Sequence, residues 1–152
     1  MRISVKVDYA VRAMIQLAAV SSDEPVKADT IARAQDIPLK FLLGILSDLK
    51  RAHLLRSQRG AEGGYWLARP AEEITVADVI RAVEGPLAHV RGERAENLEY
   101  PEGTGALQEL WVAVRASLRN VLEHTTLAAI ATDDLPPAIK ALTSDPDAWQ
   151  AH

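Results

Sequence analysis

The sequence of 152 residues contains no cysteine. Without thiols the chain can form no disulfide, no thiolate zinc site and no thiolate-held iron–sulfur cluster, and it has no thiol nucleophile. Long apolar segments are also missing: no run of about eighteen apolar residues could span a bilayer, and the start of the chain lacks the apolar stretch of a signal peptide. These absences predict a cytoplasmic protein with no membrane partner.

Recognisable catalytic motifs are missing as well. The sequence has no P-loop, no glycine fingerprint that opens a helix, and no set of nucleophile, base and orienting residue. The glycine-rich segment 60–64 lies between two extended runs, where it is typical of a turn. We therefore expect no catalytic residues and no enzymatic activity.

Charge is divided unequally between the two halves of the chain. Residues 1–70 carry 11 Lys and Arg against 7 Asp and Glu, whereas residues 71–152 carry 6 against 14. The overall charge of -4 conceals this division, and affinity for phosphate depends on local rather than total charge. The pattern favours a basic binding face joined to an acidic module, with a chance distribution and a solvated acidic tail as the alternative.

Apolar spacing predicts three helices in the first half. Residues 4–20 form a helix that is apolar on more than one face, so it is buried on two sides, in a core or between subunits. Residues 28–35 form a short helix, and a tight turn leads to a further helix that begins at Pro38. The inward face of this third helix consists of Phe41, Leu42, Ile45, Leu46 and Leu49.

The outward face of the third helix carries Leu43 and Gly44, which are unusual choices for a solvated surface. A glycine inside a helix costs about 1 kcal/mol relative to alanine. Either close approach to another surface or neutral drift accounts for Gly44. Two short extended runs follow at 54–58 and 65–69, and the segment 59–64 between them indicates a hairpin with a glycine-rich tip.

This order of helix, helix-turn-helix and hairpin is that of a winged helix, a mainly α fold with a small β-hairpin wing. In that fold the second helix of the pair enters the major groove of DNA and the wing touches backbone or minor groove. The predicted DNA-binding residues are Lys40, Leu43, Gly44, Ser47, Lys50, Arg51, Arg56, Arg59 and Gly60. A solvated surface charge is the alternative for each cation taken alone, but their clustering favours phosphate contacts.

The second half is predicted to contain two helices joined by a loop. Thr75 and Asp78 form a capping box before a helix that ends at Gly85, and residues 86–103 have almost no apolar periodicity, which predicts a solvated loop. A long helix begins at Thr104, with a heptad-like seam that favours homodimerisation, although a core helix of a single chain has the same pattern. The residues of this seam are Leu107, Trp111, Val114, Leu118 and Val121.

Four regions follow from these patterns: a DNA-binding domain at 1–85, a linker at 86–103, a dimerisation region at 104–131 and an acidic flexible tail at 132–152. Within the third region, Thr126 is expected to cap a short helix at 127–131. Paired Asp and Pro residues beyond it are typical of a frayed end.

The residues that define these regions resemble the BadM/Rrf2 family of winged-helix regulators. The resemblance runs through segments 8–13, 31–46, 57–68 and 74–85 and covers about residues 1–131. It is most specific in the hairpin, from Ser57 to Ala68. The resemblance implies a homodimer, held by the long helix together with the first helix, that binds a palindromic operator in double-stranded DNA, usually as a repressor.

Two departures limit what the resemblance implies. Cluster-binding relatives commonly have Glu-Gln where this chain has Leu43 and Gly44, and several relatives place three cysteines in the region that is 86–106 here. We therefore expect no cofactor and a signal other than an iron–sulfur cluster, such as a small molecule or a protein acting on the loop. Two alternatives are a cysteine-free metal site using Asp8, His89 and nearby glutamates, and a winged helix used for protein interaction.

Overall fold

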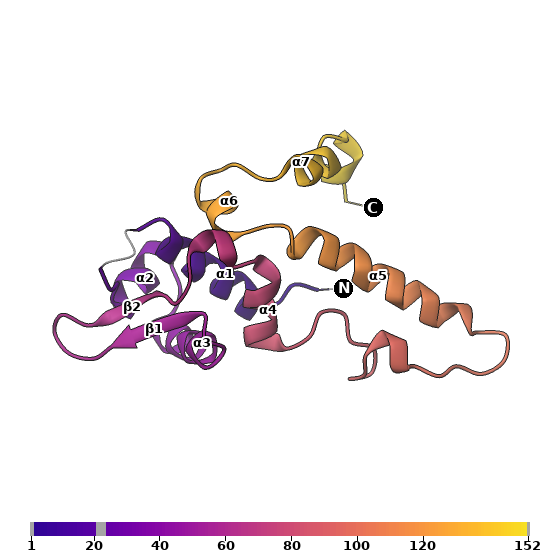
Figure 1. Ribbon diagram of the computed structural model, residues 1–152, viewed down its shortest axis with the longest axis horizontal. Coiled ribbons are helices and arrows are strands. Elements are labelled where there is room, and N and C mark those ends of the chain that lie inside the picture. The colour runs from indigo at the N-terminus through magenta and orange to yellow at the C-terminus, as the bar shows by residue number, and fades with distance from the viewer. Residues whose placement is uncertain (1, 21–23, 152) are drawn as a thin grey trace.

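Four helices of the N-terminal half pack around one apolar core: α1 (Val5–Ala18), α2 (Ala28–Gln35), α3 (Leu39–Arg51) and α4 (Val76–Glu84). The computed structural model describes residues 2–20 and 24–151, and Figure 1 shows these helices gathered beside a two-stranded hairpin. The largest fully buried side chains are Met14, Ile31, Leu42, Ile45, Leu46, Leu49, Ile74, Val79 and Leu127. The predicted fold class, a mainly helical winged helix with a β-hairpin, is confirmed.

The helix-turn-helix consists of α2 and α3. Asp36 adopts a left-handed conformation (φ 51°, ψ 51°) that ends α2, and the Ile37 amide donates to the Ala32 carbonyl at 2.9 Å. Ile37 itself is buried and anchors the turn in the core. The turn therefore sets the angle at which α3 crosses α2.

Phe41 was expected on the inward face of α3, and the structure shows this expectation to be wrong. Its side chain is 47% exposed, and its ring meets that of Tyr9 edge-on with centroids 5.7 Å apart. At 3.6 residues per turn, Phe41 lies about 100° around the helix from its neighbour Leu42. The inward stripe is thus narrower than predicted, and Phe41 borders the outward face.

The wing is an antiparallel hairpin of β1 (Leu55–Gln58) and β2 (Gly64–Leu67). Its register pairs Arg56 with Trp66. Val26 adds a bridge on the other side of β2, since it and Tyr65 exchange two backbone hydrogen bonds of 2.8 Å. A Cβ on Gly64 would lie 2.6 Å from the Val26 carbonyl oxygen, so this close approach requires glycine.

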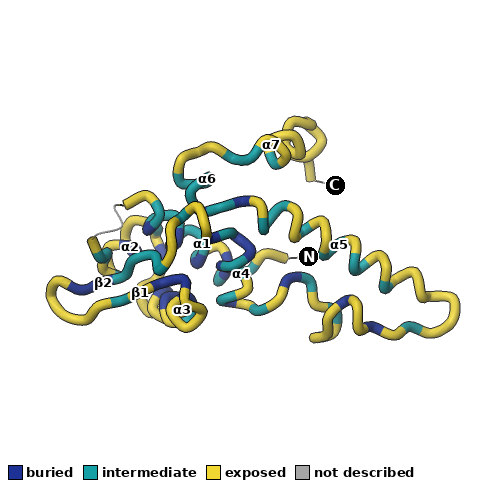
Figure 2. Tube along the Cα trace, in the orientation of Figure 1, coloured by how far each residue is buried: buried dark blue, intermediate teal, exposed yellow. Residues whose placement is uncertain are grey.

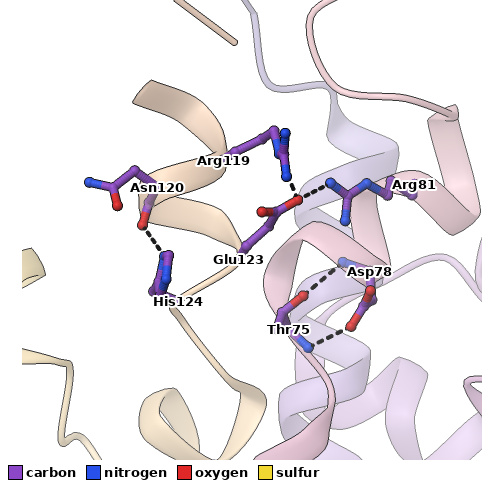
Figure 3. Close-up of polar contacts among 7 residues, drawn as sticks. All are labelled: Thr75, Asp78, Arg81, Arg119, Asn120, Glu123 and His124. Carbon is purple, nitrogen blue, oxygen red and sulfur yellow. Dashed lines mark hydrogen bonds and ion pairs between the residues drawn. The ribbon is translucent and has the colours of Figure 1, made fainter. Parts of the chain in front are cut away.

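Helix α4 begins with the predicted capping box. The Asp78 amide donates to Thr75 Oγ1 at 3.1 Å, and the Thr75 amide donates to Asp78 Oδ2 at 3.0 Å (Figure 3). The short helix α6 (Leu127–Ala131) is capped by Thr126 as expected, and its Leu127 is fully buried. Both capped helices pack against α1.

The segment 86–103 differs from the solvated loop that was expected. It contains a short 3-10 turn, η2 (Ala95–Asn97), and buries Ala95 and Leu98. Its side chains pack along the long helix α5 (Ala106–Leu122), where Trp111 Nε1 donates to Tyr100 Oη at 3.0 Å. The few apolar residues of this segment are irregularly spaced, so they produce no periodic signal although they pack.

The C-terminal region also departs from the frayed tail that was expected. Helix α7 (Pro137–Thr143) and a 3-10 turn, η3 (Pro146–Trp149), follow α6, and Trp149 Nε1 donates to the Thr143 carbonyl at 2.8 Å. Figure 2 shows this region almost wholly exposed, as expected for an acidic end. The C-terminal region thus forms local helical structure although few of its side chains are buried.

None of the helices within residues 2–20 and 24–151 is both long and apolar enough to cross a bilayer.

Candidate nucleic-acid interface

The outward face of α3 surrounds an open hollow of about 510 Å³. Four predicted DNA-binding residues line it: Lys40, Gly44, Ser47 and Arg51. They recur at spacings of four and three residues, so they lie on one side of the helix. A Cβ on Gly44 would meet no atom within 4 Å. The missing side chain therefore leaves space between Lys40, Ser47 and Arg51.

Leu43 and Lys50, seven residues apart and so on the same side of α3, are both exposed next to this hollow. Leu43 keeps 45% of its surface accessible, although an apolar side chain gains nothing from contact with water. An exposed leucine between cations offers an apolar contact for a partner surface. The arrangement agrees with the outward placement predicted from the sequence.

The other four residues of the hollow, Lys6, Phe41, Ile45 and Asp48, were not among the predicted DNA-binding residues. Lys6 comes from α1, and its Nζ lies 2.8 Å from Asp48 Oδ2 of α3. Asp48 also pairs through Oδ1 with Arg51 at 3.3 Å. A cation 42 residues away in sequence gives no local signal of this proximity. That Lys6 belongs to this surface could be found only from the three-dimensional structure.

The remaining cations of this surface are free to meet phosphates. Among the ion pairs between described residues, none involves Lys40, Lys50 or Arg59. All three side chains are exposed. Because no carboxylate competes for them, their charge is available to an anionic partner. Lys6 and Arg51, by contrast, share the single carboxylate of Asp48.

The loop between β1 and β2 points away from the body of the protein, on the side opposite α5 (Figure 1). Arg59 and Gly60 belong to this loop, directly after β1. Gly60 has φ +104°, and the Gly63 amide donates to its carbonyl at 3.0 Å. A Cβ on Gly63 would lie 2.2 Å from the Gln58 carbonyl oxygen. The tight turn thus depends on glycine and presents Arg59 in the open.

Arg56 is separated from the α3 hollow. Its guanidinium carbon lies 5.4 Å from the centre of the Trp66 ring, which is its cross-strand partner. Both side chains line a different cavity, of about 480 Å³, that also includes Leu17 at the end of α1. The structure therefore does not bring Arg56 together with the cations of α3.

The predicted heptad-like seam lies on α5, and we call it the α5 seam: Leu107, Trp111, Val114, Leu118 and Val121. It is only partly covered within the single chain. Helix α5 is described in full and has no buried residue among its 17. Leu107 is 37% exposed and the other four residues of the seam are half-buried. Leu110, just beside the seam, is 50% exposed. Figure 1 shows α5 extending away from the N-terminal helices, so most of its length lies beyond them.

No metal site emerges from the residues proposed as an alternative. Among residues 2–20 and 24–151, no group of three or more His, Asp or Glu side chains is placed to hold an ion. Asp8 instead pairs with Arg12 at 3.2 Å, and His89 lies among arginines. These contacts favour structural and electrostatic roles for Asp8 and His89.

A helix-turn-helix with a basic outward helix face, followed by a glycine-tipped hairpin, defines a winged-helix DNA-binding protein. A family model described as Rrf2, iron-dependent transcriptional regulator, matches residues 3–133. The chain belongs to the Rrf2 family of transcriptional regulators. It is a DNA-binding regulator and not an enzyme.

Two similar proteins carry the names of transcriptional regulators. Rv1287 of Mycobacterium tuberculosis, an HTH-type transcriptional regulator by name, is 52% identical over 145 residues, covering 95% of this chain and 90% of that protein. CymR of Bacillus subtilis, also named an HTH-type transcriptional regulator, is 37% identical over 132 residues, covering 87% and 91%.

Solved structures show the same architecture. The structure of CymR, described as the global cysteine regulator of B. subtilis, has a TM-score of 0.73 at 35% identity and covers 88% of this chain and 98% of that one. The IscR structure of T. potens has a TM-score of 0.71 at 31% identity and covers 99% and 97%.

The iron dependence in the family description does not fit the donors of this chain. Iron–sulfur clusters in proteins are held chiefly by cysteine thiolates, and the sequence has none. The described His, Asp and Glu side chains do not converge as an alternative ligand set. A thiolate-held cluster therefore has no ligands here.

Proposed function

We propose that the protein is a homodimeric repressor that binds a palindromic operator, with α3 of each protomer in the major groove. The observation that carries this proposal is the outward face of α3, where an open hollow at Gly44 is bordered by polar and basic side chains. Glycine at this point lets the helix backbone approach another surface closely. Free cations at Lys40 and Lys50 suit the phosphates on either side of a groove.

The proposal divides the surface into contacts that read bases and contacts that position the protein. Ser47 can hydrogen-bond to a base edge, and Leu43 suits the methyl group of thymine. Arg51 and the lysines of α3 contact phosphates, which orient the helix without reading sequence. Arg59 at the wing tip reaches the minor groove beside Gly60. Arg56 contacts backbone at the edge of the wing.

The α5 seam supplies the dimer contact in this proposal. Its residues follow a heptad-like spacing, and they remain half-buried or exposed in the single chain. Pairing with a second copy would remove that apolar surface from water. A two-fold dimer places its recognition helices about one helical turn of DNA apart, ~34 Å. Occupation of such a site in a promoter would exclude RNA polymerase.

The signal in this proposal is not an iron–sulfur cluster. The chain lacks thiolates, so operator binding is expected of colourless, metal-free protein. A small molecule or a partner protein acting on the 86–103 segment would instead change how α5 and the winged helix are held together. Any such effector must bind one arrangement more tightly than the other.

A gel-shift experiment tests the proposal. Metal-free protein is mixed with genomic fragments, including the promoter of its own gene, in the presence of excess competitor DNA. We expect a subset of fragments to shift, with an affinity that falls steeply as salt rises because phosphate contacts release counterions. In vitro transcription from a shifted promoter should decrease. Absence of any selective shift would instead favour a winged helix that binds proteins.

A further inference from the structure

Four arginines from three separate segments surround one small cavity in the acidic half of the chain. Residues 71–152 contain only 6 Lys and Arg against 14 Asp and Glu. Four of these six cations, Arg81, Arg94, Arg115 and Arg119, line a cavity of about 290 Å³. We call it the arginine cavity. Surface cations scattered at random in an acidic region would not gather in this way.

Each wall of the arginine cavity comes from a different element. Arg81 belongs to α4, and Arg94 comes from the 86–103 segment together with His89. Arg115 and Arg119 are four residues apart on α5, so they lie on the same side of that helix. Figure 3 shows Arg81 and Arg119 reaching toward the same carboxylate from facing helices. The cavity is therefore the junction of the winged helix, the segment and α5.

The arginines of the cavity outnumber the carboxylates that they contact. Glu123 Oε1 accepts from Arg119 Nε at 3.0 Å and also from Arg81, and these hydrogen bonds lower the pKa of Glu123. Glu96 pairs with Arg115. Arg94 forms none of the ion pairs between described residues, and the hydrogen bonds to Glu96, the charge of Arg115 and the charge of Arg94 together lower the pKa of Glu96. Two carboxylates for four guanidinium groups leave an excess of positive charge at the cavity.

We propose that the arginine cavity binds a small molecule with at least two anionic groups, and that this molecule is the effector of the regulator. A guanidinium group donates two parallel hydrogen bonds to a carboxylate or a phosphoryl group, which makes arginine suited to both. Ligand cavities usually measure about 300–1,000 Å³. The volume here, about 290 Å³, is just below this range, which suits a molecule the size of a tricarboxylate or a pyrophosphate and not a dinucleotide.

Contacts from α4 provide a route from this cavity to α3. Lys6 Nζ donates to the carbonyl of Val83, in the last turn of α4, at 2.8 Å, and the same group pairs with Asp48 of α3 at 2.8 Å. A ligand that draws Arg81 toward α5 would act on α4 and, through Lys6, on α3. This regulatory consequence rests on the proposed function, whereas anion binding itself does not.

Isothermal titration calorimetry of the full-length, DNA-free protein with pyrophosphate and with citrate tests the binding site. We expect saturable binding of one molecule per chain to at least one probe, with a Kd of about 1 mM or below. Preference for pyrophosphate would indicate a phosphoryl ligand, and preference for citrate a carboxylate ligand. Lack of saturable binding by both probes would overturn the proposal.

Matched variants locate the bound anion. Arg94→Ala breaks no ion pair and should weaken binding about tenfold, because it removes a charged hydrogen-bond donor. Arg91→Ala removes the same charge from the same segment outside the cavity and should change the Kd by less than about twofold. Glu96→Gln should tighten binding, which a purely structural role would not explain. Equal losses in the two arginine variants, or a loss in Arg59→Ala at the wing, would overturn the site.

The effector role is tested on DNA with the same probe. Addition of the bound probe should change the operator affinity of the parent and leave that of Arg94→Ala unchanged. Anion binding that leaves operator affinity unaltered would refute the effector role. Failure of the parent to bind any DNA selectively would refute the proposed function instead, whatever the calorimetry shows.

Discussion

Replacement of Gly44 by alanine separates the stability of α3 from its function. Gly44 lies inside a helix, and an added Cβ would meet no atom of the chain within 4 Å. Alanine is favoured over glycine in a helix interior by about 1 kcal/mol. The variant should therefore be more stable than the parent, with a Tm higher by about 2–4 °C for a chain of this size.

Operator binding by Gly44→Ala should change in the opposite direction. The added methyl group occupies the hollow through which α3 is proposed to approach DNA, and overpacking of a close contact costs about 1–3 kcal/mol. Operator affinity should fall about tenfold to a hundredfold. Thermal unfolding and fluorescence anisotropy on a labelled operator duplex measure the two effects.

Gly105→Ala serves as the control for this experiment. Gly105 precedes α5, and a Cβ there also meets no atom within 4 Å, so the variant adds the same methyl group away from α3. It should leave operator affinity unchanged. A stabilised Gly44→Ala protein that binds the operator as well as the parent would refute close approach at this position, and neutral drift would then account for the glycine.

Four further substitutions test other parts of the structure. Arg59→Ala should weaken operator binding by about 1–3 kcal/mol and leave the Tm unchanged, as anisotropy and thermal unfolding would show. Leu118→Glu places an unpaired charge in the α5 seam and should give a folded monomer in analytical ultracentrifugation, so a stable dimer would place the interface elsewhere. Thr75→Ala removes a cap and should lower the free energy of unfolding by about 1 kcal/mol in urea titrations. Glu123 has a lowered pKa because Arg119 and Arg81 donate hydrogen bonds to it. Parent protein should therefore exceed Glu123→Gln in stability at neutral pH, and the difference should vanish as pH falls through that lowered pKa.

Features set by neighbouring residues were predictable from the sequence. The bounds of α2, the capping box at Thr75 and the cap at Thr126 agree with the structure because each depends on side chains within a few residues. The outward residues of α3 were predicted for the same reason, since helical spacing assigns them to one side. Local chemistry was thus enough to place α3 and the wing.

Features that depend on contacts between distant segments were not predictable in this way. Lys6 joins the α3 surface through Asp48, 42 residues later, and Phe41 is turned outward against Tyr9. The 86–103 segment packs on α5 with irregularly spaced apolar residues, so it lacked the periodic pattern that identifies an element. The arginine cavity combines α4, this segment and α5, and its residues showed no clustering along the sequence.

Quantitative footprinting on a selected operator, combined with sedimentation of the complex, tests the central claim most directly. Metal-free protein should protect two half-sites of an inverted repeat whose centres lie about one helical turn apart, ~34 Å. The complex should contain two protein chains per duplex. Protection of a single unrepeated site by one chain, or binding that unrelated duplex competes away equally well, would contradict the account of a dimeric operator-binding regulator.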